Sequence, residues 1–246
     1  MHQIVQTQPE SVGTARTPRH DMYVGIHKAL RAWMTDTLAA LGRMDADDAV
    51  EVAETLARVR GLLLQCRSHL AHENTFIHTA MEARCPGSSQ RIAGEHVGHV
   101  QSIEAIEVAV KAVERSPAGA RSAAAPQLYR QLTLFVADNF QHMHVEETQN
   151  NRVLWDACSD EELAQIHGAL VASIPPEEMQ LTLRWLIPFL SHGERVGLLA
   201  GAKQGMPEEA FQGVLAIARA HLSPRDWAKL TKALGLGTES GLGIVR

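Results

Sequence analysis

The sequence has few aromatic residues, few cysteines and no long hydrophobic run. Aromatic residues make up 4% of its 246 residues, whereas hydrophobic residues of all kinds make up 45%. A low aromatic content disfavours a β-sandwich and favours helices that pack through Leu, Ala and Val. Strand-like alternation of useful length is also missing. These features predict an all-α protein.

The three cysteines, Cys66, Cys85 and Cys158, form no Cys-x-x-Cys pair and are odd in number. We therefore expect no disulfide framework and a reducing, cytoplasmic location. No stretch reaches the apolar length that a membrane span needs, so we expect no membrane partner. Residues 1–18 lack the apolar run of a secretion signal, which predicts a mobile tail.

The charge pattern excludes further classes of function. The net charge is −5 and no basic block occurs, which argues against general nucleic-acid binding. The sequence has no glycine-rich loop of the kind that cradles phosphates and no Ser-His-Asp nucleophile set. Chemistry is therefore expected from the 13 histidines and the acidic residues near them.

Apolar residues recur with the period of a helix through the first two thirds of the chain. The breaks are Gly42, the CPGSS segment after Arg84 and the SPAGARSAAAP segment, after which Pro126 is expected to open a helix. The long helices predicted between these breaks cover residues 19–42, 48–84, 90–115 and 126–156. They predict an up-down four-helix bundle.

Shorter helices are expected after a break near Ser159. The segment Ser159-Asp160-Glu161-Glu162 has the form of a capping box, and similar helix starts follow at Ser191 and Ser223. The short helices predicted here cover residues 160–172, 176–189, 192–204, 207–221 and 224–234. The predicted organisation is a tail at 1–18, a bundle at 19–158, a helical lobe at 159–235 and a loose terminus at 236–246.

The four long helices carry histidines and glutamates that are spaced one helical turn apart. The spaced pairs are His69 with Glu73, His96 with His99 and His142 with Glu146, and His27 stands alone on the first helix. Residues three or four apart lie on one face of a helix. A bundle that aims such residues inward builds a metal cage. Imidazole and carboxylate donors suit iron, manganese or zinc.

Burial favours metal ligation over a purely structural role for these residues. His69 and Glu73 share an apolar stripe, where an unpaired carboxylate is costly. A lone histidine such as His27 is often a core residue, but the three other clusters make it a candidate ligand. Glu147 is a weaker candidate than Glu146, because a neighbouring glutamate usually faces solvent.

On the third helix, two histidines compete for the same role. The local motif favours His96, whereas reflection of the other ligand positions across the turns favours His99. Whether one or both bind stays open. Glu95 is expected to be a surface charge, with hydrogen bonding to a ligand as the alternative. His72, His78 and His144 lie off the cluster faces and are expected at the surface or as partners of ligands.

Over about residues 20–157 these motifs resemble the hemerythrin-like (HHE cation-binding) family. The motifs are IHKALR with His27, HLAHE with His69 and Glu73, GEHVGH with His96 and His99, and HMHVEE with His142 and Glu146. The resemblance implies a four-helix bundle around a non-haem di-iron centre with bridging carboxylates. Family members that carry oxygen place two histidines four apart on the third helix, whereas this sequence has them three apart.

The resemblance implies a protein that binds or senses oxygen, nitric oxide or peroxide through two iron ions, with manganese or zinc as substitutes. The histidine-rich set favours a carrier or sensor over an enzyme, because di-iron oxidases carry more glutamate. One alternative is a di-iron oxidase or peroxidase. Another is a regulatory or scaffold module that acts through residues 159–235, and self-association as a homodimer stays open.

Overall fold

The computed structural model describes residues 19–236, and all regular secondary structure in this range is helical. The all-α prediction is therefore confirmed for these residues. The tail predicted at residues 1–18, and the predicted terminus beyond residue 236, lie outside the described residues.

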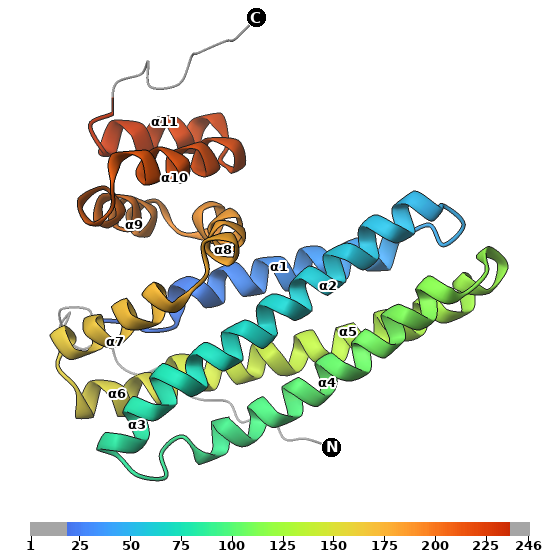
Figure 1. Ribbon diagram of the computed structural model, residues 1–246, viewed down its shortest axis with the longest axis horizontal. Coiled ribbons are helices and arrows are strands. Elements are labelled where there is room, and N and C mark those ends of the chain that lie inside the picture. Colours follow the sequence, from blue (N-terminus) through green and yellow to red (C-terminus); the bar gives the residue numbers. More distant parts are fainter. Residues whose placement is uncertain (1–18, 237–246) are drawn as a thin grey trace, which may run out of the picture.

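The four longest helices lie alongside one another, with connections at alternate ends (Figure 1). They are α1 (Val24–Arg43), α2 (Ala49–His72), α4 (Gln90–Arg115) and α5 (Ala118–Val145). Helix α1 packs on α2 and α5, and α4 packs on the same two helices. Aliphatic residues from all four, including Leu30, Leu62, Ile103 and Leu132, are buried in one core between them.

Two of the long helices continue through a π-helical segment into a further helix. Helix α2 runs into η1 (Glu73–His78) and α3 (Thr79–Arg84), and α5 runs into η2 (Glu146–Asn150) and α6 (Asn151–Ala157). Short π-helical segments are rare and occur often at functional sites. Here each one begins at a glutamate that the sequence marks as a candidate ligand.

Two predicted helix starts were wrong. Helix α1 begins at Val24 and not at residue 19, because the Asp21 carboxylate accepts hydrogen bonds from the backbone N–H groups of Tyr23 and Val24, both at 2.9 Å. Helix α5 begins at Ala118, so the expected linker is helical and Pro126 lies inside the helix. The alanine-rich stretch before Pro126 has a high helix propensity, which outweighs the proline.

Each of the short helices begins and ends within one residue of its predicted bounds. They are α7 (Asp160–Ser173), α8 (Pro176–Phe189), α9 (His192–Gly205), α10 (Glu208–His221) and α11 (Pro224–Ala233). Capping boxes at Ser159 and Ser191 start α7 and α9. Helix α7 packs on η1, and α8 packs on both α1 and α10. A separate core, which includes Ile187, Leu199 and Phe211, holds α8 to α11 together.

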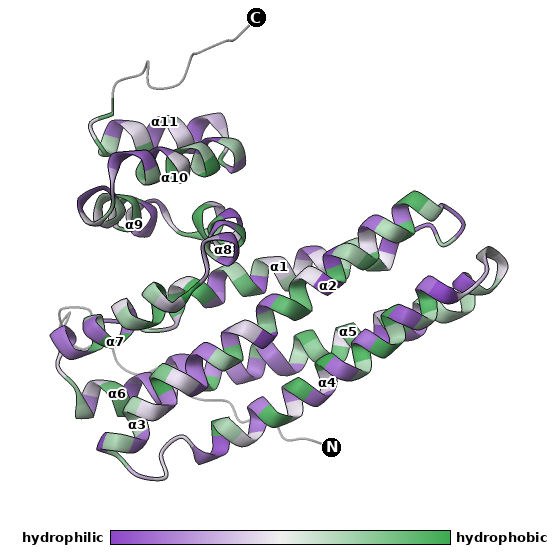
Figure 2. Cartoon of the chain, in the orientation of Figure 1, coloured by the Kyte–Doolittle hydropathy of each residue, from purple (hydrophilic) through white to green (hydrophobic). Residues whose placement is uncertain are grey.

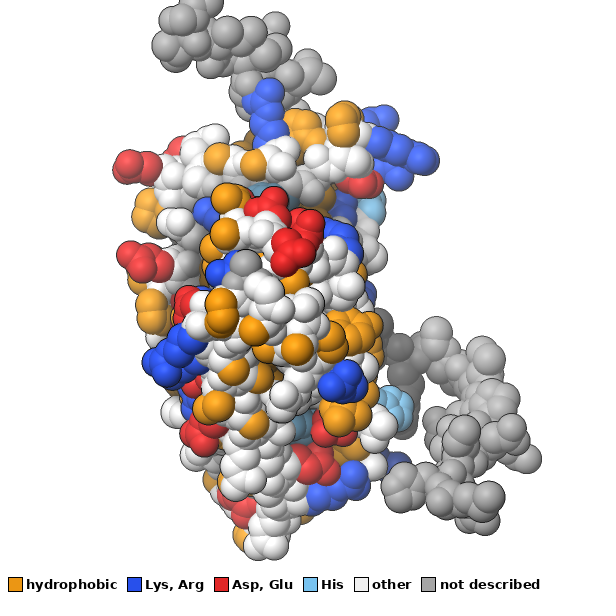
Figure 3. Space-filling view, turned by 90° about the vertical axis from the view of Figure 1, so that its right-hand side faces the viewer, with side chains coloured by type: hydrophobic (Ala, Val, Ile, Leu, Met, Phe, Trp, Pro, Cys, Tyr) orange, Lys and Arg blue, Asp and Glu red, His pale blue; other side chains and the backbone are white. Residues whose placement is uncertain are grey.

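Hydrophilic residues occur along every long helix (Figure 2). Among the described residues, no helix combines the length and the apolar character that crossing a membrane requires. On the face drawn in Figure 3, acidic and basic side chains are interspersed among hydrophobic and uncharged ones.

Candidate metal centre

Each long helix contributes one histidine to a common buried site. His27 comes from α1, His69 from α2, His96 from α4 and His142 from α5. Three of these side chains are buried, and that of His69 is only 11% exposed. The buried carboxylates of Glu73 and Glu146 join them from the first positions of η1 and η2.

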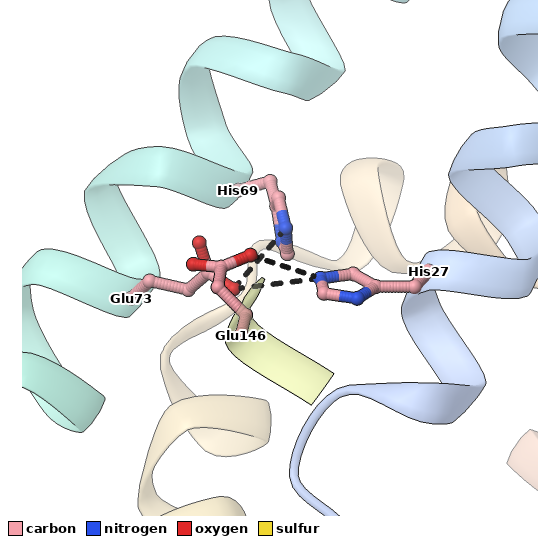
Figure 4. Close-up of side chains that lie close together, drawn as sticks. All are labelled: His27, His69, Glu73 and Glu146. Carbon is pink, nitrogen blue, oxygen red and sulfur yellow. Dashed lines mark ion pairs between the residues drawn. The ribbon is translucent and has the colours of Figure 1, made fainter. Parts of the chain in front are cut away.

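The six side chains form two overlapping groups of potential metal ligands. One group contains His27, His69, Glu73 and Glu146, and the other contains Glu73, His96, His142 and Glu146. Within each group the ligand atoms all lie within 4.8 Å of one another. Both glutamates belong to both groups. Figure 4 shows the first group converging, with His69 and Glu73 on one continuous ribbon and His27 and Glu146 on two others.

The distances between these atoms fit a shared ion. His27 Nε2 lies 3.4 Å from Glu146 Oε2, and His69 Nε2 lies 3.2 Å from Glu73 Oε1. In the second group, His142 Nε2 lies 3.2 Å from Glu146 Oε1. Two donor atoms that bind one first-row metal ion at about 2.0–2.2 Å are about 3.0–3.5 Å apart.

Most of these atoms have no hydrogen-bond partner among the described residues. They are Nε2 of His27 and of His69, and both carboxylate oxygens of Glu73 and of Glu146. Burying a carboxylate without a partner is costly, and native proteins pair such groups or let them coordinate metals. The donor set therefore fits a metal ion, which would satisfy all six atoms.

The second ring nitrogen of His27 points away from this site. His27 Nδ1 lies 3.1 Å from Glu147 Oε1, and the Glu147 carboxylate also accepts hydrogen bonds from the Arg31 guanidinium at 2.6 and 3.0 Å. A ligating histidine usually donates its other N–H to such a partner, which fixes the ring orientation. Glu147 belongs to neither ligand group and instead orients His27.

His96 and His142 are held in the same way. His96 Nδ1 lies 2.8 Å from Asn74 Oδ1, and His142 Nδ1 lies 2.9 Å from Glu95 Oε2. Arg91 donates a hydrogen bond to Glu95 at 3.0 Å. The expectation that Glu95 is only a surface charge was wrong, because its position on α4 faces α5. Nothing in the sequence indicated a role for Asn74, because its side chain reaches His96 from the π-helical segment η1, which the helical pattern did not predict.

The pKa values of the site reflect burial and the neighbouring charges. Burial lowers the pKa of His69 to about 4, so this imidazole stays neutral with its lone pair available. Burial also lowers the pKa of His27, but Glu147 and Glu73 outweigh it and raise the value to about 9. For Glu146, burial raises the pKa, yet the neighbouring imidazoles of His142 and His96 hold it below the ordinary value. Without a metal, a protonated His27 therefore offsets part of the buried negative charge.

His99 lies beside the site but belongs to neither ligand group. Its side chain is 7% exposed, and its ring centre lies 4.6 Å from that of His142. The Nδ1 atom of His99 has no hydrogen-bond partner among the described residues. Burial lowers the pKa of His99 to about 4, with the nearby charges of His142 and His96 adding to the effect.

Other residues noted in the sequence surround the site at various depths. His78, expected off the cluster face, is buried and stacks on His96 with ring centres 4.8 Å apart. His144 is exposed, as expected. Tyr23 lies four residues before His27 on the same apolar stripe of the sequence, and it is fully buried with its ring centre 5.3 Å from that of His27. Burial, together with the charges of the two ligand-group glutamates, raises the pKa of Tyr23 well above its ordinary value.

No family model, curated protein or solved structure matches this chain. The resemblance to hemerythrin-like proteins therefore rests on the sequence motifs. The convergence of four histidines and two glutamates from separate helices is a second observation that does not depend on the resemblance. Together the described residues contain buried His/Glu groups that could hold metal ions.

Proposed function

We propose that this chain is a cytoplasmic non-haem di-iron protein of the hemerythrin-like kind. Its long helices would form the up-down four-helix bundle of that family, and its function would be to bind or sense oxygen, nitric oxide or peroxide. The observation that carries the proposal is the pair of overlapping ligand groups that share two buried glutamates without hydrogen-bond partners.

Each residue has a role in this proposal. His27 and His69 would hold one ion, and His96 and His142 would hold the other. Glu73 and Glu146 would contribute carboxylate ligands to both ions, because each belongs to both ligand groups. Mixed nitrogen and oxygen donors suit iron, manganese or zinc, and the resemblance to hemerythrin-like proteins implies iron.

The chain's own groups prepare the site for a small ligand. Iron ions with open coordination positions supply the capacity to bind a diatomic molecule or peroxide. Glu147, Asn74 and Glu95 orient three of the imidazoles through Nδ1. The hydrophobic core around the site limits access of water, which strengthens the interaction between carboxylates and cations.

Iron content and an absorption spectrum test the proposal. Protein expressed with ample iron should contain two irons per chain and show a visible to near-ultraviolet band that changes when the reduced protein is aerated. His142→Ala should lose iron and the band. His144→Ala is a matched control, because this exposed histidine lies on the same helix, and it should keep both. Wild-type protein that contains no metal would contradict the proposal.

A di-iron peroxidase or oxidase is the second candidate. A groove of about 700 Å³, larger than a diatomic molecule needs, lies beside His142 and favours this possibility. Peroxide turnover that His142→Ala abolishes and His144→Ala retains would support an enzyme. Iron-loaded protein without turnover would support simple binding.

A regulatory or scaffold role for the lobe predicted at residues 159–235 is the third candidate. Phe189, at the end of α8, is 49% exposed, whereas most large apolar residues of this region are packed in the core of α8 to α11. Light scattering on the full-length chain and on a chain that ends at residue 158 tests whether this region mediates a homodimer. If both chains are monomers, this region does not mediate a homodimer.

A further inference from the structure

A groove between α4 and α5 reaches only one of the two ligand groups. Its polar and charged lining consists mainly of Arg91, Glu95, His99, Asp138, His142 and His144. His142 belongs to the ligand group that also contains His96. Neither His27 nor His69 lines this groove. The groove therefore borders the half of the site that contains His142.

The ring of His27 is covered by other side chains, whereas His69 in the same half is 11% exposed. Tyr23 is fully buried against His27, and the ion pair of Glu147 with Arg31 covers the outer nitrogen of that ring. These groups already have roles in packing and in orienting His27.

The register of α4 places His99 beside this half. At 3.6 residues per turn, a residue three positions after His96 is turned by about 60° to one side, and Val100 is turned by about 40° to the other. Val100 packs against the main hydrophobic core. His99 instead contacts α5, where its ring lies edge-on to His142 and to Phe135.

His99 also carries an unsatisfied polar atom at this position. Its Nδ1 is buried without a hydrogen-bond partner, which costs free energy unless another group pairs with it. The same side chain lines the groove. Because Nδ1 is shielded from solvent, the ring can meet a ligand in the groove only through Nε2, which in a neutral imidazole can donate or accept a hydrogen bond.

We propose that the groove between α4 and α5 is the route by which a small anion or diatomic molecule reaches the His96–His142 half of the site. His99 contacts this incoming ligand through a hydrogen bond and does not itself bind metal. The inference rests on the proposed function and assigns the entry side and the residue that governs ligand affinity.

Azide binding to the iron-loaded full-length protein tests this inference, with iron content and melting temperature as parallel readouts. His99→Ala should keep two irons per chain but should bind azide about fivefold to tenfold more weakly. Its melting temperature should fall, because removal of a buried ring leaves a cavity, and His99→Gln should lose less. His99→Gln should recover part of the affinity, because its amide is polar and of similar size. His144→Ala, at the exposed part of the same groove, should match wild type in all three measurements.

Two results would overturn the inference while leaving the proposed function intact. If His99→Ala contains one iron fewer, His99 is a metal ligand. If both His99 variants bind azide within twofold of wild type, His99 does not contact the ligand. Wild-type protein that takes up no iron would instead overturn the proposed function, so the two failures are distinguishable. Should His99→Ala fail to fold, His99→Gln decides through the same iron count and azide affinity.

Discussion

At the scale of single residues, the proposed role of each histidine depends on which of its two ring nitrogens faces the buried site. His69 shows this most simply, because its Nε2 is buried without a hydrogen-bond partner and its pKa is lowered to about 4 by burial. We expect His69→Ala to remove at least one of two irons. The rise in melting temperature that iron produces should fall by half or more, whereas the metal-free protein should change little.

Differential scanning calorimetry with and without iron measures both effects. Glu54→Ala, an exposed change on the same helix, is the control and should behave like wild type. An equal loss of stability with and without iron would show that His69 acts only in packing.

Glu95 allows a test of how much a hydrogen bond to the outer nitrogen of His142 contributes to metal affinity. It accepts the hydrogen bond of His142 Nδ1 at 2.9 Å and is itself held by Arg91. We predict that Glu95→Gln binds the ion of the His96–His142 half about 10–100-fold more weakly, because outer partners of this kind typically contribute that much. A competition titration with a chelator measures it. Glu104→Gln, an exposed change on the same helix, should leave the affinity unchanged, and a Glu95→Gln protein equal to it would refute the positioning role.

The convergence of His27, His69, Glu73, His96, His142 and Glu146 could be predicted from the sequence, because residues one turn apart share a helix face whatever the tertiary structure. The outer partners could not. Asn74 reaches His96 from within η1, and a π-helical segment depends on packing that no local pattern encodes. His99 shows the limit of helical spacing: three residues from His96 is close enough to share a face, yet the structure places it beside the ligand groups and not within them.

At the scale of helices, periodicity and capping residues predicted most bounds to within one residue. The third long helix, Gln90–Arg115, was predicted at both ends. The failure at α5 has a simple cause. Proline is favoured in the first turn of a helix, so Pro126 indicated a start, whereas the preceding alanine-rich residues are helical from Ala118.

An exposed proline inside a helix gives a direct prediction. Pro126 lacks a backbone N–H and its ring crowds the preceding turn, so it should weaken α5. We expect Pro126→Ala to raise the free energy of unfolding by about 1–3 kcal/mol. Urea denaturation measures this, with the exposed neighbour change Gln127→Ala as a control that should stay within about 0.5 kcal/mol of wild type. A destabilised Pro126→Ala protein would mean that the proline fits a local distortion.

At the scale of the whole molecule, the sequence predicted a break at residue 159 but not how the later helices attach. Helix α8 lies on α1, and Trp185 stacks on Trp33 with ring centres 5.2 Å apart. Lys28 of α1 also pairs with Glu194 of α9 at 2.6 Å. Such contacts join residues more than 150 positions apart, which no local pattern in a single sequence reports.

The ion pair of Lys28 with Glu194 should make stability depend on pH. Hydrogen bonds from Lys28 and Ser191 lower the pKa of Glu194 to about 2, below its ordinary value of 4.5. A carboxyl whose pKa is lower in the folded state stabilises the protein above its ordinary pKa, and this contribution is lost as the pH falls from about 5 to about 2. Glu194→Gln should therefore lower the melting temperature at pH 7 and converge with wild type in acid.

The effect should be small, at most about 1 kcal/mol, because both side chains are about one-third exposed and solvent screens the charges. Thermal melts of the metal-free protein across this pH range measure it, and Glu161→Gln, an exposed change on α7, should show no such dependence. A difference between Glu194→Gln and wild type that grows toward acid would contradict the assignment.

Diffraction from iron-loaded crystals, measured at the iron absorption edge, tests the metal centre most directly. We predict two anomalous peaks per chain, one between His27 and His69 and one between His96 and His142, with Glu73 and Glu146 in contact with both. Peaks only at surface histidines, or no peak where these six side chains converge, would show that the buried cluster holds no di-iron centre.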